Sequence, residues 1–127
     1  YDDVMAELMR FFEERIAYAT RAWIAENRIW LDPGFGFGKK VGHNLTILRR
    51  LAEFKRLGRP VLMGTSNKST ISAVLDVPAD QRFEGTAATV ALSIANGADA
   101  VRVHDVRAMA RVARMCDAIL GKGGHHE

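Results

Sequence analysis

The chain has 127 residues, 48% of them hydrophobic, which is enough for one small domain with its own core. Its net charge of +3 comes from scattered basic residues, a pattern that disfavours nucleic-acid binding and suits small anionic ligands. No run approaches the roughly 18 apolar residues of a membrane span, no secretory signal is visible, and the single Cys116 cannot form an internal disulfide. We therefore expect a cytoplasmic protein.

Apolar residues at three- and four-residue steps predict an amphipathic helix from about residue 3 to 26. Its buried stripe would consist of Met5, Leu8, Phe12, Ile16, Ala19 and Trp23. The short run 28–31 then predicts a buried strand that ends on the carboxylate of Asp32. Asn44 is a candidate N-cap for a second helix, which Gly58 would end. The inward residues of that helix would be Ile47, Leu48, Leu51 and Phe54.

The second half of the chain repeats the alternation of strand and helix. The expected order is a strand at 60–63, a short helix from Ser69 to about Val74, a loop at 75–81, a helix at 83–96 ended by Gly97, a strand at 100–104, a helix capped by Asp105 and a flexible tail at 121–127. The last helix would bury Met109, Val112, Ala113, Cys116, Ile119 and Leu120. This order predicts a parallel α/β sheet with helical crossovers. Because three strands are few for such a sheet, we expect a larger barrel, pairing with another copy, or marginal stability.

The segment Leu31–Lys39, with sequence LDPGFGFGK, predicts a ligand site. Three alternating glycines let the backbone approach a flat ligand, while Phe35 and Phe37 offer faces for stacking. A carboxylate at Asp32 beside that surface suits a nitrogen-rich heterocycle. The alternative is an ordinary turn that Asp32 caps. The spacing matches neither the dinucleotide-binding nor the P-loop glycine pattern.

Polar residues also follow the other two predicted strands. If the strands are parallel neighbours, the side chains that converge on one rim are Asp32, Ser66, Lys68, Arg102 and His104. Arg102 and His104 share a face of their strand and form a clamp suited to phosphate or pyrophosphate. Ser69 and Thr70 stand at a helix start, where free N–H groups attract anions. The alternatives are that Arg102 pairs with Asp99 or Asp105, and that the backbone satisfies His104.

Four segments together resemble the C-terminal half of dihydropteroate synthases, in order and at family-like spacing. They are 31–39, 64–69 (GTSNKS), 82–87 (RFEGTA) and 101–105 (VRVHD). The resemblance implies a (β/α)8 TIM barrel, of which residues 1–120 would supply about the last three strands and their helices. It also implies the folate-pathway reaction that sulfonamides inhibit, in which para-aminobenzoate displaces pyrophosphate from 6-hydroxymethyl-7,8-dihydropterin pyrophosphate.

The resemblance also implies a role for each matching residue. Pterin contacts would come from Asp32, Gly64 and Lys68; para-aminobenzoate contacts from Phe37, Ser66 and Ser69; pyrophosphate contacts from Arg102 and His104. The catalytic residues would be Lys68, Arg102 and His104. The family's Mg²⁺ is held by an asparagine of the N-terminal half, so we expect no metal ligand in this chain. We expect a homodimer or association with the missing half, and no nucleic acid or membrane partner.

Asn67 stands where the family usually has arginine, which would alter one wall of the para-aminobenzoate pocket. Two other interpretations therefore stay open. One is a non-catalytic or diverged pterin-binding half-barrel. The other is a pterin-binding domain of the methyltetrahydrofolate methyltransferase type, which has no use for a pyrophosphate clamp.

Overall fold

The computed structural model describes residues 3–34, 40–65 and 68–122. Its elements are α1 (Val4–Arg21), η1 (Glu26–Arg28), α2 (Val41–Arg49), η2 (Leu51–Leu57), β1 (Leu62–Gly64), α3 (Lys68–Leu75), η3 (Ala79–Gln81), α4 (Phe83–Ala95), β2 (Ala100–Arg102) and α5 (Val106–Leu120), where η marks a 3-10 helix. The predictions for Phe35, Phe37, Ser66, Asn67 and the end of the tail concern positions outside these ranges.

The predicted parallel arrangement is confirmed. β1 and β2 pair in parallel, with Leu62 opposite Ala100 and Gly64 opposite Arg102. On the other edge of β1, Val61 forms a parallel bridge with Leu31. The strand predicted at 28–31 is therefore reduced to a single bridging residue, because residues 26–28 form the turn η1. The three segments lie side by side in chain order.

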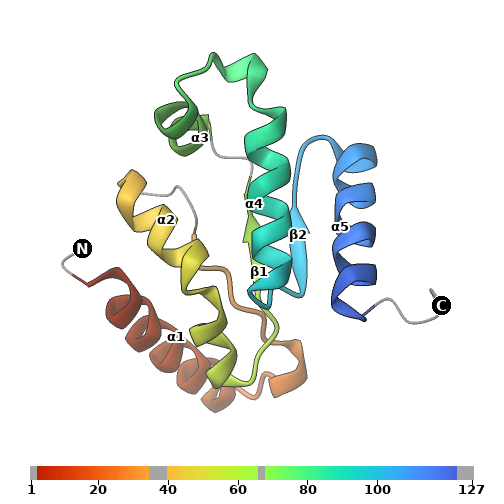
Figure 1. Ribbon diagram of the computed structural model, residues 1–127. Helices are drawn as coiled ribbons and strands as arrows, with labels where there is room; N and C mark the ends of the chain where they lie inside the picture. The colour runs from red at the N-terminus through yellow and green to blue at the C-terminus, as the bar shows by residue number, and fades with distance from the viewer. Residues whose placement is uncertain (1–2, 35–39, 66–67, 123–127) are drawn as a thin grey trace.

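Helices cover one face of these strands. In Figure 1, α4 lies over the strands and α5 lies beyond β2. α2 and α1 lie beyond β1, on the side away from α5. Val61 and Met63, at alternate positions, are fully buried, whereas Leu62 and Gly64 between them are only partly buried. Since successive side chains of a strand point to opposite faces, Val61 and Met63 belong to the packed face.

Two apolar clusters hold the helices to the sheet. The larger one joins α1, α2 and η2 to the strands through Val4, Met5, Leu8, Phe12, Leu31, Ile47, Leu48, Leu51, Phe54, Val61, Met63 and Ala98. The rings of Phe12 and Phe54 meet edge to face at its centre, 5.3 Å apart. The smaller cluster, between α4 and α5, is built on Val90, Ile94 and Met109.

The first helix is shorter than predicted. Asp3 caps α1 by accepting a hydrogen bond from the Ala6 N–H at 3.1 Å, and the helix ends at Arg21 rather than near residue 26. Trp23 has a positive φ of 68° and is 96% exposed, so it does not extend the buried stripe. The left-handed backbone at Trp23 turns the chain away from the helix axis, which helical periodicity does not reveal.

The second helix begins before Asn44, so the prediction that Asn44 is its N-cap was wrong. Lys40 precedes α2, and its N–H donates to Nδ1 of His43 at 3.3 Å. Asn44 lies within the helix, 2% exposed, and its Nδ2 donates to Oγ1 of Thr70 at 2.9 Å. Gly58 ends η2 in the left-handed conformation, with φ 70°, as predicted. The four inward residues predicted for this region are buried.

The C-terminal elements follow the prediction more closely, except that the strand predicted at 100–104 ends at Arg102, so His104 lies in the bend before α5 rather than on the strand. Asp105 caps α5 by accepting from the Ala108 N–H at 3.1 Å, and Gly97, with φ 104°, follows α4. The predicted stripe of α5 holds as far as Cys116, which packs against the smaller cluster. Ile119 and Leu120 are 72% and 44% exposed, because α5 extends past α4 at this end.

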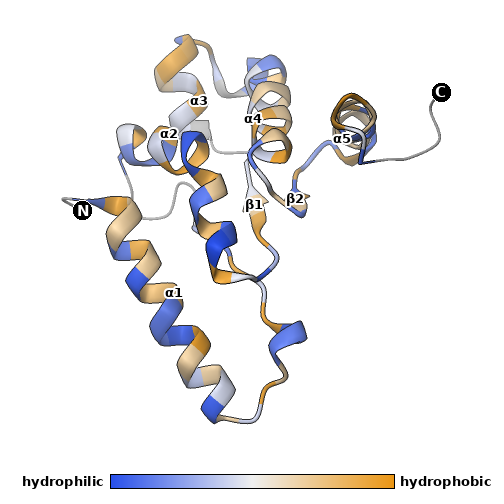
Figure 2. Cartoon of the chain, turned by 60° about the horizontal axis from the view of Figure 1, so that its bottom comes forward, coloured by the Kyte–Doolittle hydropathy of each residue, from blue (hydrophilic) through white to orange (hydrophobic). Residues whose placement is uncertain are grey.

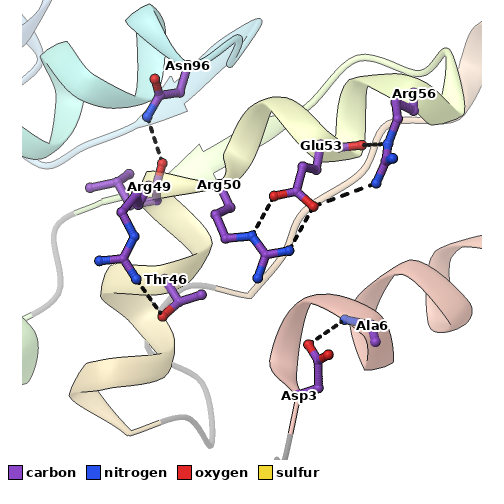
Figure 3. Close-up of polar contacts among 9 residues, drawn as sticks. Asp3, Ala6, Thr46, Arg49, Arg50, Glu53, Arg56 and Asn96 are labelled. Atoms are coloured by element: carbon purple, nitrogen blue, oxygen red, sulfur yellow. Dashed lines mark hydrogen bonds and ion pairs between the residues drawn. The ribbon is translucent and has the colours of Figure 1, made fainter.

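Polar contacts tie the helix ends together (Figure 3). Asn96, at the end of α4, donates through Nδ2 to the carbonyl oxygen of Leu48 in α2 at 2.8 Å. Glu53 receives a two-point contact from Arg50 and a further one from Arg56 on the surface of η2. The Asn96 contact spans the two helices and therefore fixes their relative position, whereas the Glu53 contacts are local.

Large apolar side chains remain exposed at both sides of the sheet. They include Phe11, Tyr18, Trp23, Ile24 and Trp30 on the α1 side, and Val106, Met115, Ile119 and Leu120 on α5. Figure 2 shows that α1 and α5 each contain both apolar and polar positions. Among the helices described, none combines the length and apolar character that a membrane crossing requires.

Candidate active site

The parallel register brings Asp32 and Arg102 to the same rim. Asp32 follows the residue that bridges β1 on one edge, and Arg102 ends β2 on the other edge, opposite Gly64. Nη1 of Arg102 lies 3.5 Å from Oδ2 of Asp32. Both side chains are partly open to solvent, at 56% and 37% exposure. A carboxylate and a guanidinium from positions 70 residues apart thus share one site.

The contact between Arg102 and Asp32 passes over the backbone of Gly64. A Cβ atom built on Gly64 would overlap the terminal nitrogen of Arg102 and would stand 3.0 Å from its Cζ. The guanidinium therefore lies directly on the glycine backbone as it extends toward Asp32. Any larger residue at position 64 would have to displace it.

The alternative interpretation, in which Arg102 pairs with Asp99 or Asp105, is wrong. Asp99 accepts hydrogen bonds from Lys55 and from the Val61 N–H, the latter at 2.9 Å. Asp105 is occupied as the cap of α5. The partner is Asp32, which sequence reasoning placed near Arg102 without pairing the two.

Asp32 also caps its own turn. Its Oδ1 accepts a hydrogen bond from the Gly34 N–H at 2.9 Å. The interpretation of Asp32 as a turn-capping residue is therefore correct for one oxygen, while the other faces Arg102. The first contact fixes the orientation of the carboxylate, so the second oxygen is presented at the rim.

The start of α3 lies at the end of β1. Lys68 is the first residue of α3, Ser69 is exposed, and Thr70 is buried against Asn44. This hydrogen bond fixes α3 against α2, and so positions the helix start that carries Ser69. The Lys68 side chain, like Phe37 and Ser66, belongs to the positions that the structure leaves undescribed.

His104 lines a cavity of about 260 Å³ next to the rim. The other lining residues are Asp80, Arg82, Phe83, Thr86, Asp105 and Met109. Of these, Arg82 was part of the segment RFEGTA, but sequence reasoning gave it no role. An arginine directly before a predicted helix was the available signal.

In the part of the chain described, the side chains that could bind a metal do not cluster into a metal site. Across residues 3–34, 40–65 and 68–122, no three His, Cys, Asp or Glu side chains converge. Magnesium needs several oxygen ligands. These residues therefore do not fit Mg²⁺, and no chemical step is assigned to a metal here.

Parallel strands joined by helices, with acidic and basic side chains at their carboxyl ends, place the chain in the α/β class, in which functional sites lie at this edge of the sheet. Residues 1–104 match the family described as pterin binding enzyme. The chain therefore belongs to the pterin-binding enzyme family.

Proteins similar to this chain include dihydropteroate synthases. The enzyme of Bacillus subtilis is 47% identical over 126 residues, which are 99% of this chain and 44% of that protein. The Yersinia pestis synthase solved with a sulfonamide drug superposes with a TM-score of 0.91 at 39% identity, over 95% of this chain and 44% of that one. The Xanthomonas albilineans synthase in complex with 7,8-dihydropteroate gives 0.90 at 40% identity, over 94% and 46%. The chain thus spans less than half the length of these relatives and has the fold of part of a dihydropteroate synthase.

Proposed function

We propose that this chain is the C-terminal half of a dihydropteroate synthase. In this proposal it supplies part of the site that joins para-aminobenzoate to 6-hydroxymethyl-7,8-dihydropterin pyrophosphate. The observation that carries the proposal is the position of Asp32 and Arg102, 3.5 Å apart at the strand ends. A carboxylate suits the amino-pyrimidine edge of a pterin, and an adjacent arginine suits the pyrophosphate that the same substrate carries.

We propose the remaining residue roles from the resemblance to dihydropteroate synthases. Lys68 contacts the pterin, Gly64 forms the pocket wall beneath Arg102, and His104 joins Arg102 in holding pyrophosphate. Phe37, Ser66 and Ser69 surround para-aminobenzoate, with Ser69 at the start of α3 receiving its carboxylate. The exposed position of Ser69 supports this last assignment.

In the reaction, the bond between the pterin methylene carbon and the pyrophosphate oxygen breaks, and pyrophosphate leaves with the bonding electrons. The nitrogen of para-aminobenzoate then attacks the methylene carbon and loses a proton to solvent. Arg102 and His104 stabilise the negative charge that develops on the leaving oxygen. Removing one preorganised hydrogen-bond donor aimed at a developing negative charge typically costs an enzyme about 3–4 kcal/mol of transition-state stabilisation.

The test measures pyrophosphate release that depends on para-aminobenzoate, in the presence of Mg²⁺. It compares the chain alone with the chain joined to the complementary segment of the Bacillus subtilis enzyme, of which the chain matches 44%. We expect activity only in the joined protein, because the chain alone lacks over half of the relatives' length. The joined protein with Arg102→Ala is the matched negative control.

The contrary result is a joined protein that folds and binds pterin but fails to bind para-aminobenzoate and shows no activity. That result would replace the proposal with a diverged pterin-binding half-barrel. Asn67→Arg is the first reversion to make in that case, because this position departs from the family pattern.

A further inference from the structure

The segment RFEGTA at residues 82–87 has no part in the site described so far. It forms the entry to α4, which begins at Phe83. Gly85 packs closely on α3: a Cβ there would overlap Ile71 and would stand 3.1 Å from Cδ1 of Leu75. This close packing fixes the start of α4 relative to α3, and it therefore holds Arg82 at a defined place beside the rim.

Arg82 and His104 line the same cavity, which lies between the starts of α4 and α5. The cavity has a volume of about 260 Å³, just below the range of sites for drug-sized ligands. Its floor is apolar, since Met109 is 1% exposed, and Thr86 adds a hydroxyl at 8% exposure. A small polar ligand fits this combination of size and lining.

Arg82 holds a donor without an acceptor. Its Nη1 is buried and, within the described part of the chain, has no hydrogen-bond partner. The two carboxylates that line the cavity do not supply one. Asp105 caps α5, and Asp80 is exposed on η3 and forms no ion pair with Arg82 among the described contacts. A buried guanidinium nitrogen without an acceptor is unfavourable in the free protein. Because the Arg82 side chain lines the cavity, a turn of the guanidinium toward it would let Nη1 donate to a ligand oxygen there.

We infer that Arg82 is a further ligand for the pyrophosphate leaving group, acting with His104 on its outer phosphoryl group. The inference rests on the proposed function, in which Arg102 and His104 hold pyrophosphate. His104 links the two positions, because it follows Arg102, the last residue of β2, by two residues and lines the same cavity as Arg82. The outer phosphoryl group carries the larger charge, so a buried guanidinium donor is the appropriate contact.

The experiment uses the joined, full-length barrel described above and three variants: Arg82→Gln, Arg82→Lys and, as control, Arg114→Gln. Arg114 is an exposed arginine of α5, so its variant makes the same charge change away from the cavity. Calorimetry measures the Kd for inorganic pyrophosphate and for 6-hydroxymethyl-7,8-dihydropterin. Thermal unfolding without ligand gives the Tm of each variant.

We expect Arg82→Gln to raise the Kd for pyrophosphate about tenfold or more, the loss typical of one hydrogen bond to a charged group. Its Kd for the free pterin should stay within about twofold, Arg82→Lys should recover part of the loss, and Arg114→Gln should change pyrophosphate binding less than about twofold. The Tm of Arg82→Gln should equal or exceed that of the parent, since Nη1 has no protein partner to lose. A purely structural arginine would instead lower the Tm.

Equal pyrophosphate binding by Arg82→Gln and Arg114→Gln would overturn the inference. So would a fall in Tm accompanied by equal weakening of pyrophosphate and pterin. Arg102→Ala is measured alongside these variants. If it abolishes pyrophosphate binding while Arg82→Gln binds as Arg114→Gln does, the proposed function stands and only the role of Arg82 falls. If the unsubstituted barrel binds neither probe, both are wrong.

Discussion

Gly64 is the residue on which the contact between Asp32 and Arg102 depends. We predict that Gly64→Ala displaces the Arg102 guanidinium, since the new Cβ overlaps its terminal nitrogen. Inserting a methyl group into a close contact typically destabilises a protein by about 1–3 kcal/mol, with the lower end expected for a partly exposed side chain. Denaturant unfolding measures this change. Calorimetry with pyrophosphate on the joined barrel should show weaker binding.

Gly42→Ala is the matched control for that substitution. Gly42 lies within α2, and a Cβ there meets nothing within 4 Å. We expect this variant to gain about 0.5–1 kcal/mol of stability, because alanine loses less backbone entropy in a helix than glycine does. It should bind pyrophosphate as the parent does. Similar losses of binding in both variants would contradict the role given to Gly64.

Asp99 is a carboxylate whose environment should contribute to stability against acid. Burial acts to raise the pKa of Asp99, but hydrogen bonds from Lys55 and the Val61 N–H outweigh it and hold the pKa below the ordinary value. A depressed carboxyl pKa contributes stability above the unfolded-state pKa, and that stability is lost as the pH falls through the folded-state pKa. The free energy of unfolding should therefore decline below about pH 4.

The test compares the parent with Asp99→Asn in urea unfolding between pH 2 and pH 7. We expect the parent to be more stable at neutral pH and the two curves to converge in acid, because a protonated Asp99 has no charge to offer Lys55. The difference in free energy of unfolding between the parent and Asp99→Asn at neutral pH should be small, since 41% of the Asp99 side chain is exposed. Parallel curves would show that Asp99 has no part in the acid transition.

At the scale of the elements, the bond between Asn44 and Thr70 holds α3 to α2. Both side chains are 2% exposed, so we predict that Asn44→Ala and Thr70→Val each cost about 1–3 kcal/mol of stability. The double variant should lose less than the sum, with a coupling of at least about 0.5 kcal/mol. Thr46→Val is the control: Thr46 bonds the Gly42 carbonyl on the exposed side of α2, and its loss should stay within about 0.5 kcal/mol. Strict additivity of the two buried changes would contradict the prediction.

The elements that sequence analysis predicted well are those set by local chemistry. Gly58 supplies a left-handed helix end and Asp105 supplies a cap, and each acts within a few residues of its own position. Phe54 was predicted inside because helical periodicity reports burial directly. These features need no knowledge of the distant chain.

The features that were missed depend on long-range contacts. Asn44 is a good N-cap residue in general, yet here a partner 26 residues away holds it inside the helix. The pairing of Arg102 with Asp32 requires the register of three strands and the absence of a side chain at Gly64. The parallel order of the strands was enough to predict that Asp32 and Arg102 lie at one rim, but the contact between them depends on distances that only the fold supplies.

At the scale of the whole molecule, both open sides of the sheet carry exposed apolar side chains. On the α1 side, Phe11, Tyr18 and Trp30 line an exposed groove that runs to Asp32. We propose that the complementary half of the barrel covers this groove. Joining the chain to that half should raise its Tm by about 5–10 °C or more, which corresponds to one or two kcal/mol for a domain of this size. Size-exclusion chromatography should show association of the chain alone.

Trp30→Ser should have different effects in the chain alone and in the joined protein. In the chain alone, removing a half-exposed indole should reduce self-association. In the joined protein, the same change should lower the Tm, since a contact is lost. Trp23→Ser, at a position that is 96% exposed and outside the groove, should do less in the joined protein. A Tm that does not respond to Trp30→Ser would show that the groove is not covered by the other half.

The ion pair across Gly64 has a thermodynamic consequence for the order in which ligand groups bind. In the free protein Asp32 and Arg102 contact each other. A ligand group that binds Asp32 therefore frees Arg102 to bind an anion. By linkage, an anion on Arg102 must favour binding at Asp32 to the same extent. Because the pair is largely solvent-exposed, its strength is about 0–1 kcal/mol, which limits the mutual enhancement to about fivefold. The site therefore favours a molecule that carries both groups over the two groups supplied separately.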